Sequence, residues 1–162
     1  MNAIEQLEQD HRDVEDLFDR LDVTDDPDRR RALREEIGTL LAVHALVEEE
    51  HFYPAVRQED TQALLVAFLK VHDDVKRLTA RLLRADPADD ELFCLAAQRL
   101  RLAFDRHVRE EEALLFPKAR ELLGPDTLRA LGQDMQATRE THEEIEPREY
   151  LDPENAPTGP FL

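Results

Sequence analysis

The sequence predicts an all-α fold, an antiparallel up-down-up-down four-helix bundle with a short fifth helix and an extended C-terminal tail. Apolar residues recur every three or four positions almost throughout the chain, which is the spacing of one face of an α-helix. The 162 residues include only four glycines and no tryptophan, and Leu, Ala, Arg and Glu are abundant, a composition typical of helices. The breaks between the periodic stretches are short, and short breaks connect antiparallel neighbours in a bundle.

The first two predicted helices are separated by a break that contains a proline. The apolar stripe of residues 4–21 is interrupted only at position 11, where His11 occupies a core position. Asp26 and Pro27 predict the start of the second helix, with the aspartate as N-cap and the proline in the first turn. This helix extends beyond Pro54, which we expect to kink it because a proline ring removes one backbone hydrogen bond.

Three further helices follow along the chain. The third covers residues 61–84. Asp86 and Pro87 repeat the aspartate–proline start signal, and the fourth helix then runs to residues 123–125, where a Gly-Pro pair ends it. A weaker amphipathic stretch over residues 128–145 predicts a fifth helix on the outside of the bundle.

The length predicts a single domain. We place a helical bundle domain at residues 1–146, because the periodic apolar pattern ends there. Residues 147–162 contain four prolines, several acidic side chains and few apolar ones. This proline-containing acidic segment is predicted to be an extended tail.

The charge balance excludes several classes of partner. The 21 Lys and Arg residues against 38 Asp and Glu residues give a net charge of −17, and so acidic a surface repels phosphate backbones. We therefore expect no nucleic-acid partner. No stretch has the composition of a transmembrane span or a signal peptide, so no membrane partner is expected either. The single cysteine, Cys94, excludes an intramolecular disulfide and fits a reducing compartment. These observations predict a cytoplasmic protein.

An internal repeat carries the chemistry of the chain. The segment HALVEE that begins at His44 aligns with HVREEE at His107, 63 residues further along. The alignment continues through a Tyr-Pro pair in the first copy and a Phe-Pro pair in the second. A lone histidine precedes each copy at a similar distance, His11 in one half and His72 in the other. Each half is thus a helical hairpin, and a pseudo-two-fold axis relates the two.

The repeated His-x-x-x-Glu motifs predict a buried metal site. Residues four apart lie on one face of a helix, and the repeated residues all fall within apolar stripes, so they should point into the bundle. A lone histidine is more often a satisfied core residue, and a single His-x-x-x-Glu is a common surface pair. Two copies in register are different, because two carboxylates and four imidazoles in one core are costly without cations. The candidate ligands are His11, His44, Glu48, His72, His107 and Glu111.

The donor set favours iron over zinc, because zinc sites are usually four-coordinate whereas these residues suit two ions of higher coordination number. The spacing leaves manganese or a mixed metal pair open. Ferritin-like di-iron bundles use Glu-x-x-His, with the opposite order and a shorter spacing. The order and spacing of the motifs in this chain therefore indicate a different family of bundles.

The pattern resembles the hemerythrin-like, HHE cation-binding family in its bacterial branch. The resemblance covers residues 4–123 and rests on the Asp-His pair at 10–11, the two His-x-x-x-Glu-Glu motifs with their aromatic–proline endings, and the lone His72. It implies two iron ions joined by an oxo or hydroxo bridge, with the four histidines as terminal ligands and Glu48 and Glu111 as bridging ligands. It also implies that the protein binds O₂ or related small ligands such as nitric oxide and peroxide.

Two departures from the oxygen-carrying members change the expected activity. Lys76 stands where those proteins have a second histidine on the third helix, and Glu111 replaces an aspartate one residue further along. Counting ligands then leaves one open coordination position on each ion. We therefore expect peroxide decomposition or nitric oxide chemistry rather than reversible O₂ carriage. An alternative function is an iron- or oxygen-responsive sensor that acts through a protein partner, for which the C-terminal tail is the only motivation.

Several other polar residues are predicted to lie outside the ligand set. His51 shares a face with His44, so it is either a further ligand or proton relay or a polar residue near the bundle end. Tyr53 lies about 180° from His44 on a helical wheel and is predicted to pack. Glu49, Glu50, Glu110 and Glu112 flank the candidate ligands and point sideways, so we expect most of them to be solvated, although one could orient a ligand. We expect Cys94 in the core and His142 at the surface.

Overall fold

A computed structural model describes residues 1–142 together with Glu146 and Pro147. The predicted tail at 147–162 lies, except for Pro147, outside the described residues, as does the end of the predicted fifth helix at 143–145. The described chain is all helical and contains no strand, so the predicted fold class is confirmed. None of its helices is long and apolar enough to cross a membrane.

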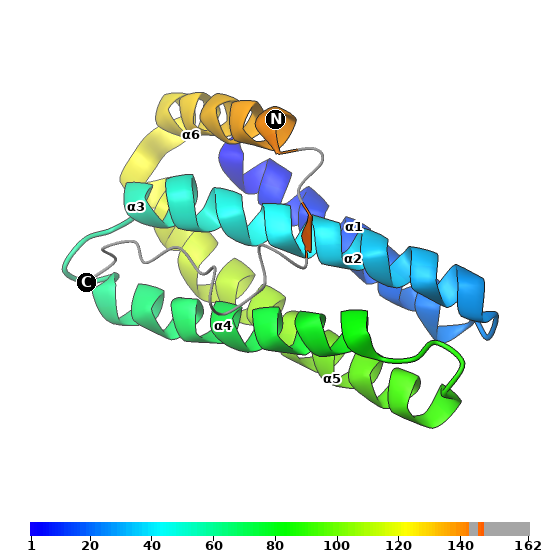
Figure 1. Ribbon diagram of the computed structural model, residues 1–162. Coiled ribbons are helices and arrows are strands. Elements are labelled where there is room, and N and C mark those ends of the chain that lie inside the picture. The colour runs from blue at the N-terminus through cyan, green and yellow to red at the C-terminus, as the bar shows by residue number, and fades with distance from the viewer. Residues whose placement is uncertain (143–145, 148–162) are drawn as a thin grey trace.

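Four long helices form the bundle (Figure 1). They pack in a ring in which each contacts two others, in the order α1, α2, α4, α5 and back to α1. Consecutive long helices run antiparallel, as the short connections predicted. Their bounds are α1 (Ala3–Asp22), α2 (Pro27–Val47), α4 (Gln62–Arg84) and α5 (Asp90–Glu110).

The helix starts follow local capping chemistry. The Asp26 side chain accepts a hydrogen bond from the Arg29 backbone N–H at 2.9 Å, which confirms the predicted start of α2. The predicted start of α5 at Asp86 is wrong. Asp86 instead closes a turn by accepting from the backbone of Ala88, and Asp89 is the N-cap. Both aspartates can cap, but the turn between them delays the helix by three residues.

The predicted second helix is not one helix with a kink at Pro54. One π-helical turn, η1 (Glu48–Phe52), joins α2 to the short helix α3 (Tyr53–Ala55). The second repeat has the same device, because η2 (Glu111–Leu115) joins α5 to α6 (Phe116–Thr141). In both copies the π-turn starts at the glutamate of the motif, and a proline follows the turn closely. The wider turn accommodates a proline, which cannot donate the regular backbone bond.

Helix α6 bends sharply at Gly124, whose φ of 67° lies in the left-handed region that favours glycine. The predicted fourth helix thus ends where the Gly-Pro pair indicated, and the predicted fifth helix is the second half of α6. This half packs against the start of α1. Gly132 makes the close approach possible, since a Cβ atom there would lie 2.8 Å from the Met1 carbonyl oxygen.

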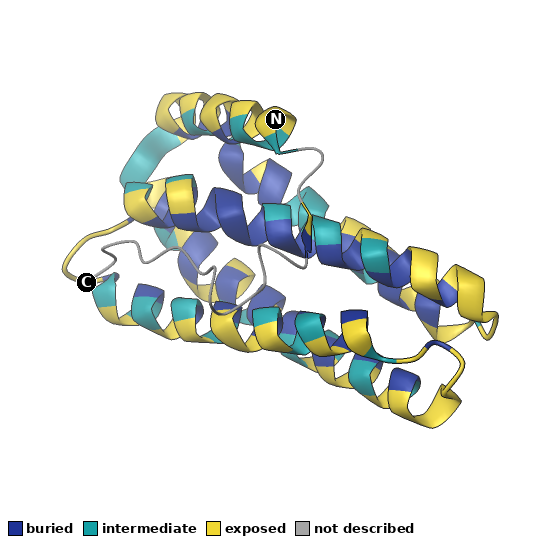
Figure 2. Cartoon of the chain, viewed as in Figure 1, coloured by how far each residue is buried: buried dark blue, intermediate teal, exposed yellow. Residues whose placement is uncertain are grey.

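Buried residues recur along each of the long helices (Figure 2). They form two hydrophobic clusters along the bundle, one containing Leu7 and Phe68 and the other containing Val14 and Val75. His11 falls between Leu7 and Val14 along α1, and His72 falls between Phe68 and Val75 along α4. A buried polar layer therefore separates the two apolar clusters.

Candidate metal centre

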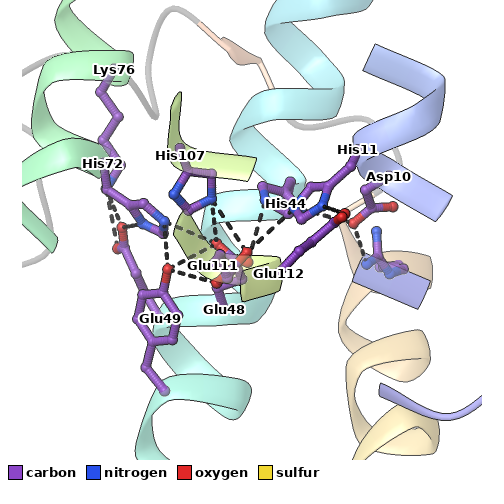
Figure 3. A network of polar contacts seen from close by, with 12 residues as sticks. Asp10, His11, His44, Glu48, Glu49, His72, Lys76, His107, Glu111 and Glu112 are labelled. Atoms are coloured by element: carbon purple, nitrogen blue, oxygen red, sulfur yellow. Dashed lines mark hydrogen bonds and ion pairs between the residues drawn. The ribbon is translucent and has the colours of Figure 1, made fainter. Parts of the chain in front are cut away.

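The structure brings all six predicted ligands together in this polar layer (Figure 3). All six are buried, with at most 3% of any of these residues exposed. Five of them offer ligand atoms that all lie within 4.8 Å of one another. The sixth, His72, joins the cluster through Glu48, whose Oε2 lies 2.9 Å from the His72 Nε2 atom. Each helix of the bundle contributes one histidine. The five mutually close residues are His11, His44, Glu48, His107 and Glu111.

The histidines form two pairs with the carboxylates between them. The ring centroids of His11 and His44 are 5.0 Å apart, and those of His72 and His107 are also 5.0 Å apart. Each carboxylate reaches both pairs, and the contacts of Glu48 show this most clearly. Its Oε1 lies 3.3 Å from the His44 Nε2 atom, while its Oε2 faces the other pair. A residue in this position can bridge two ions.

Glu111, the first residue of η2, also reaches both pairs, through a single oxygen. Its Oε2 lies 3.3 Å from the Nε2 atom of His11 and 3.5 Å from that of His107. The two carboxylates therefore occupy equivalent places in the two halves of the repeat. This arrangement is the one expected if a pair of cations sat between the histidine pairs.

Buried atoms without hydrogen-bond partners show that the cluster fits a metal. The Nε2 atoms of three histidines and one oxygen of each glutamate lack a partner within the described part of the protein. Buried polar atoms are normally satisfied, so several orphaned acceptors facing one space need an explanation. Imidazole nitrogens and carboxylate oxygens are ligands for transition metals. The buried His/Glu cluster is thus consistent with a metal centre, and it does not identify the metal.

Acidic residues support the outer nitrogens of three histidines. The Nδ1 atom of His44 lies 3.0 Å from Asp10 Oδ2, and Arg139 of α6 donates to the same oxygen at 2.7 Å. The Nδ1 atom of His11 lies 2.8 Å from Glu112 Oε1. Such contacts fix the ring and direct the other nitrogen toward the centre.

Glu49 gives the same support to His72, at 2.9 Å, and Lys76 donates to both oxygens of Glu49. We predicted that most of the four flanking glutamates are solvated and that one could orient a ligand. Two of them do so, Glu49, which is only 8% exposed, and Glu112. Lys76, where a second histidine stands in oxygen carriers, holds this carboxylate in place. His107 differs from the others, since its Nδ1 atom has no hydrogen-bond partner among the described residues.

Tyr53 is the residue that sequence reasoning missed. Its hydroxyl donates to Glu111 Oε1 at 3.1 Å and lies 2.9 Å from His72 Nε2, so it is part of the cluster. The helical wheel assumed a constant period, whereas a π-turn holds one additional residue and rotates the next helical residues by about 100°. The available signal was Pro54, a proline inside an otherwise periodic helix.

The second half of the repeat has Phe116 where the first has Tyr53. The Phe116 ring lies parallel to that of His11, with centroids 6.0 Å apart and an interplanar angle of 2°. The Tyr53 ring lies 5.2 Å from that of His72. At this position both halves place an aromatic ring beside a histidine of the cluster, and only the first half adds a hydroxyl group.

When no cation is bound, protonated histidine rings balance the negative charge of the carboxylates in the cluster. Burial lowers the pKa of His72, but hydrogen bonds to Glu48 and Glu49 outweigh burial and raise the pKa to about 10. In His11, burial is outweighed mainly by the hydrogen bond and charge of Glu111, and the pKa rises to about 9. Both rings would carry a proton at neutral pH, and metal ions would replace those protons.

Two other groups in the cluster stay neutral. Burial holds the pKa of His107 well below its ordinary value. Burial, followed by the charges of Glu111 and Glu48, raises the pKa of the Tyr53 hydroxyl well above its ordinary value. The cluster thus contains a neutral phenol that can donate a hydrogen bond to a carboxylate.

The remaining polar candidates lie away from the cluster. The Nε2 atom of His51 lies 2.7 Å from the Thr138 hydroxyl, so this histidine reaches α6 rather than the candidate ligands. His142 follows the end of α6, and its Nδ1 atom lies 2.9 Å from the Thr138 carbonyl oxygen. Cys94 is partly exposed on α5.

Known proteins share the fold and part of the sequence of this chain. A crystal structure of a hemerythrin HHE cation-binding domain-containing protein from Mycobacterium kansasii is similar, with a TM-score of 0.78 at 23% identity, over 93% of this chain and 97% of that one. A DNA nickase from Nostoc sp. is 29% identical over 143 residues, which are 86% of this chain but 39% of that relative. The chain thus spans about two fifths of that relative's length. The hemerythrin HHE cation-binding domain family matches residues 2–119, and the chain belongs to that family.

Proposed function

We propose that the cluster is a di-iron centre that binds small ligands such as nitric oxide, peroxide or O₂. The proposed ligands are His11, His44, His72 and His107 as terminal donors, and Glu48 and Glu111 as bridges. One observation carries the proposal. Each carboxylate reaches both histidine pairs, and histidine nitrogens that face the carboxylates lack hydrogen-bond partners. Two iron ions would supply ligand binding and electron exchange, which these side chains cannot provide themselves.

The protein's own residues hold the site in place and keep it dry. Asp10, Glu49 and Glu112 orient three of the histidines. The apolar clusters on both sides exclude bulk water from the polar layer. The Tyr53 hydroxyl can donate a hydrogen bond toward the centre of the cluster. A neutral donor in a dry site favours small ligands that gain negative charge as they react.

Peroxide decomposition or nitric oxide chemistry is the activity we favour over reversible O₂ carriage. The third helix has Lys76 in place of a further histidine, and Lys76 is bound to Glu49. The six proposed ligands therefore leave room for an external ligand at each ion.

The sensor alternative rests on residues 147–162, which lie outside the described residues apart from Pro147. The nickase activity named for the Nostoc relative is not favoured, since a chain with a net charge of −17 repels DNA.

Metal analysis with optical spectroscopy tests the proposal. The chain reconstituted with Fe(II) and desalted should hold about two iron ions per protein, as a site with two bridging carboxylates requires. Its absorption should change when nitric oxide or peroxide is added. His44→Ala should lose this iron, whereas His51→Ala, on the same chain segment but bonded to Thr138, should keep it. A single four-coordinate zinc ion at full occupancy would show that the proposal is wrong.

A further inference from the structure

A cavity is lined in part by Tyr53, whose hydroxyl reaches the candidate metal centre. It has a volume of about 240 Å³ and lies between α3 and the first turns of α4. Its wall is mostly apolar, formed by Pro54, Leu65, Val66 and Leu69 together with Tyr53. Pro54 is exposed, while Tyr53 and Leu65 are buried, so the cavity opens at the surface and its floor reaches the core.

The dimensions and chemistry of this cavity select small uncharged molecules. An apolar cavity of about 150 Å³ in another protein accommodates benzene or xenon, so this volume is ample for a diatomic gas. Among the described residues, Arg57 is the only charged one in the wall; it is exposed and donates to Gln62 at 3.2 Å. A charged ligand would lose its hydration in the apolar floor without gaining a partner there.

Among the described residues, Tyr53 alone belongs to both the cavity wall and the cluster. Its hydroxyl contacts Glu111 and His72. Its ring packs against Phe68, with centroids 6.2 Å apart, and against His72. One residue therefore connects the cavity with the candidate metal centre.

The other hollow beside the cluster is much smaller. It borders His44, His72 and His107 directly but has a volume of about 10 Å³. That is close to the minimum needed to hold one water molecule. It offers no space in which a diatomic ligand could collect before it reacts.

We propose that the cavity lined by Tyr53 is the binding and entry site for the small uncharged gas, nitric oxide or O₂, that the centre consumes. The gas collects in the apolar cavity and passes Tyr53 to reach the cluster. This inference rests on the proposed function. It adds a location and a route to that function.

Xenon and a cavity-filling variant test the inference separately from the metal chemistry. Val66→Trp should fill the cavity from a partly buried position, whereas Ala67→Trp places the same side chain on the exposed face of the same helix. We expect xenon, detected by its NMR shift or in crystals under pressure, to occupy the cavity in the full chain and in Ala67→Trp but not in Val66→Trp. Absence of xenon from the unaltered cavity would overturn the inference.

The route is tested by stopped-flow mixing of the iron-loaded protein with nitric oxide. Val66→Trp should slow the association about tenfold, the effect of a barrier higher by ~1.4 kcal/mol, and Ala67→Trp should leave it unchanged. Xenon displaced with no change in association rate would overturn the route and indicate entry through the smaller hollow. Failure of the unaltered iron-loaded protein to react with nitric oxide would instead count against the proposed function, and xenon occupancy would still decide whether the cavity binds a gas.

Discussion

Glu49 and Glu50 are neighbours in the sequence with different surroundings. Glu49 is buried against His72 and Lys76, while Glu50 is exposed. A carboxylate on the outer nitrogen of a histidine ligand fixes the ring and makes the other nitrogen a better donor. Position in the sequence does not separate the two residues, because both flank the motif. The difference arises from Lys76, which approaches from a different helix.

Glu49→Gln should therefore weaken metal binding, whereas Glu50→Gln should not. Loss of such a support typically lowers metal affinity about 10- to 100-fold. Competition with a chelator of known affinity, carried out in parallel on both variants, measures the effect. Equal affinities for the two variants would show that Glu49 does not support the site.

The raised pKa values of His11 and His72 predict how stability depends on pH when a chelator removes all metal. Their pKa values of about 9 and about 10 exceed the unfolded value of about 6.5. The stabilisation that the protonated His11 and His72 rings give the folded state is thus fully present below pH ~6.5 and is lost as pH rises through 9 to 10. For Asp10, burial would raise the pKa, but His44 and Arg139 outweigh burial and lower it. The stabilisation that ionised Asp10 gives the folded state is therefore lost in acid instead.

Urea denaturation of the chelated protein should give the greatest free energy of unfolding in the weakly acidic to neutral range. Stability should fall toward pH 10. A free energy of unfolding that is constant or rises between pH 7 and pH 10 would contradict the ion pairs described for the two histidines.

The π-turns are the elements that the sequence predicts least well. The apolar stripes and the repeat predict four long helices and the convergence of six residues, because those patterns depend only on a regular helical period. A helical wheel keeps that period and so carries an error of one residue past each π-turn. Tyr53 was misplaced for this reason, and the start of α5 was misplaced because two aspartates compete as caps. That the six residues bind metal stays a prediction.

Helix α6 matters to the site because Arg139, near its end, supports Asp10. Its contact with α1 depends on Gly132, whose carbonyl oxygen also accepts a hydrogen bond from the Gln6 side chain at 2.7 Å. A Cβ atom at position 132 would lie 2.9 Å from the Ala3 backbone nitrogen, closer than packed atoms tolerate. The backbone of α1 cannot move aside as a flexible side chain can.

Gly132→Ala should therefore lower the free energy of unfolding by about 1–3 kcal/mol, as overpacking does. Gln133→Ala, on the exposed face of the same turn, should change it by no more than about 0.5 kcal/mol. Thermal and urea denaturation of the two variants provide the comparison. If Gly132→Ala proves as stable as Gln133→Ala, the two helices do not pack as closely as described.

At the scale of the whole molecule, a polar layer divides the core into two apolar clusters. These clusters contain most of the large buried side chains, among them Phe18, Phe52, Phe93 and Phe104. They do not depend on metal, so the bundle should remain folded without it. In the polar layer, protons on His11 and His72 replace the charge of the cations but not their bonds to the ligand atoms.

Chelation should consequently loosen the protein without unfolding it. We expect the helical circular dichroism to be retained and the free energy of unfolding to fall by about 3–4 kcal/mol, the stabilisation given by a ligand that binds only the folded protein at 100 to 1,000 times its Kd. Calorimetry before and after chelation, with metal restored as the control, measures this loss. An unaltered melting temperature would mean that the six residues do not share a buried metal site.

The central claim is that Glu48 and Glu111 hold two iron ions between two pairs of histidines. Anomalous diffraction at the iron edge from crystals of the iron-loaded chain tests this claim most directly. We predict two iron peaks per chain, one beside His11 and His44 and the other beside His72 and His107. A single peak, or iron bound outside the polar layer, would contradict the claim.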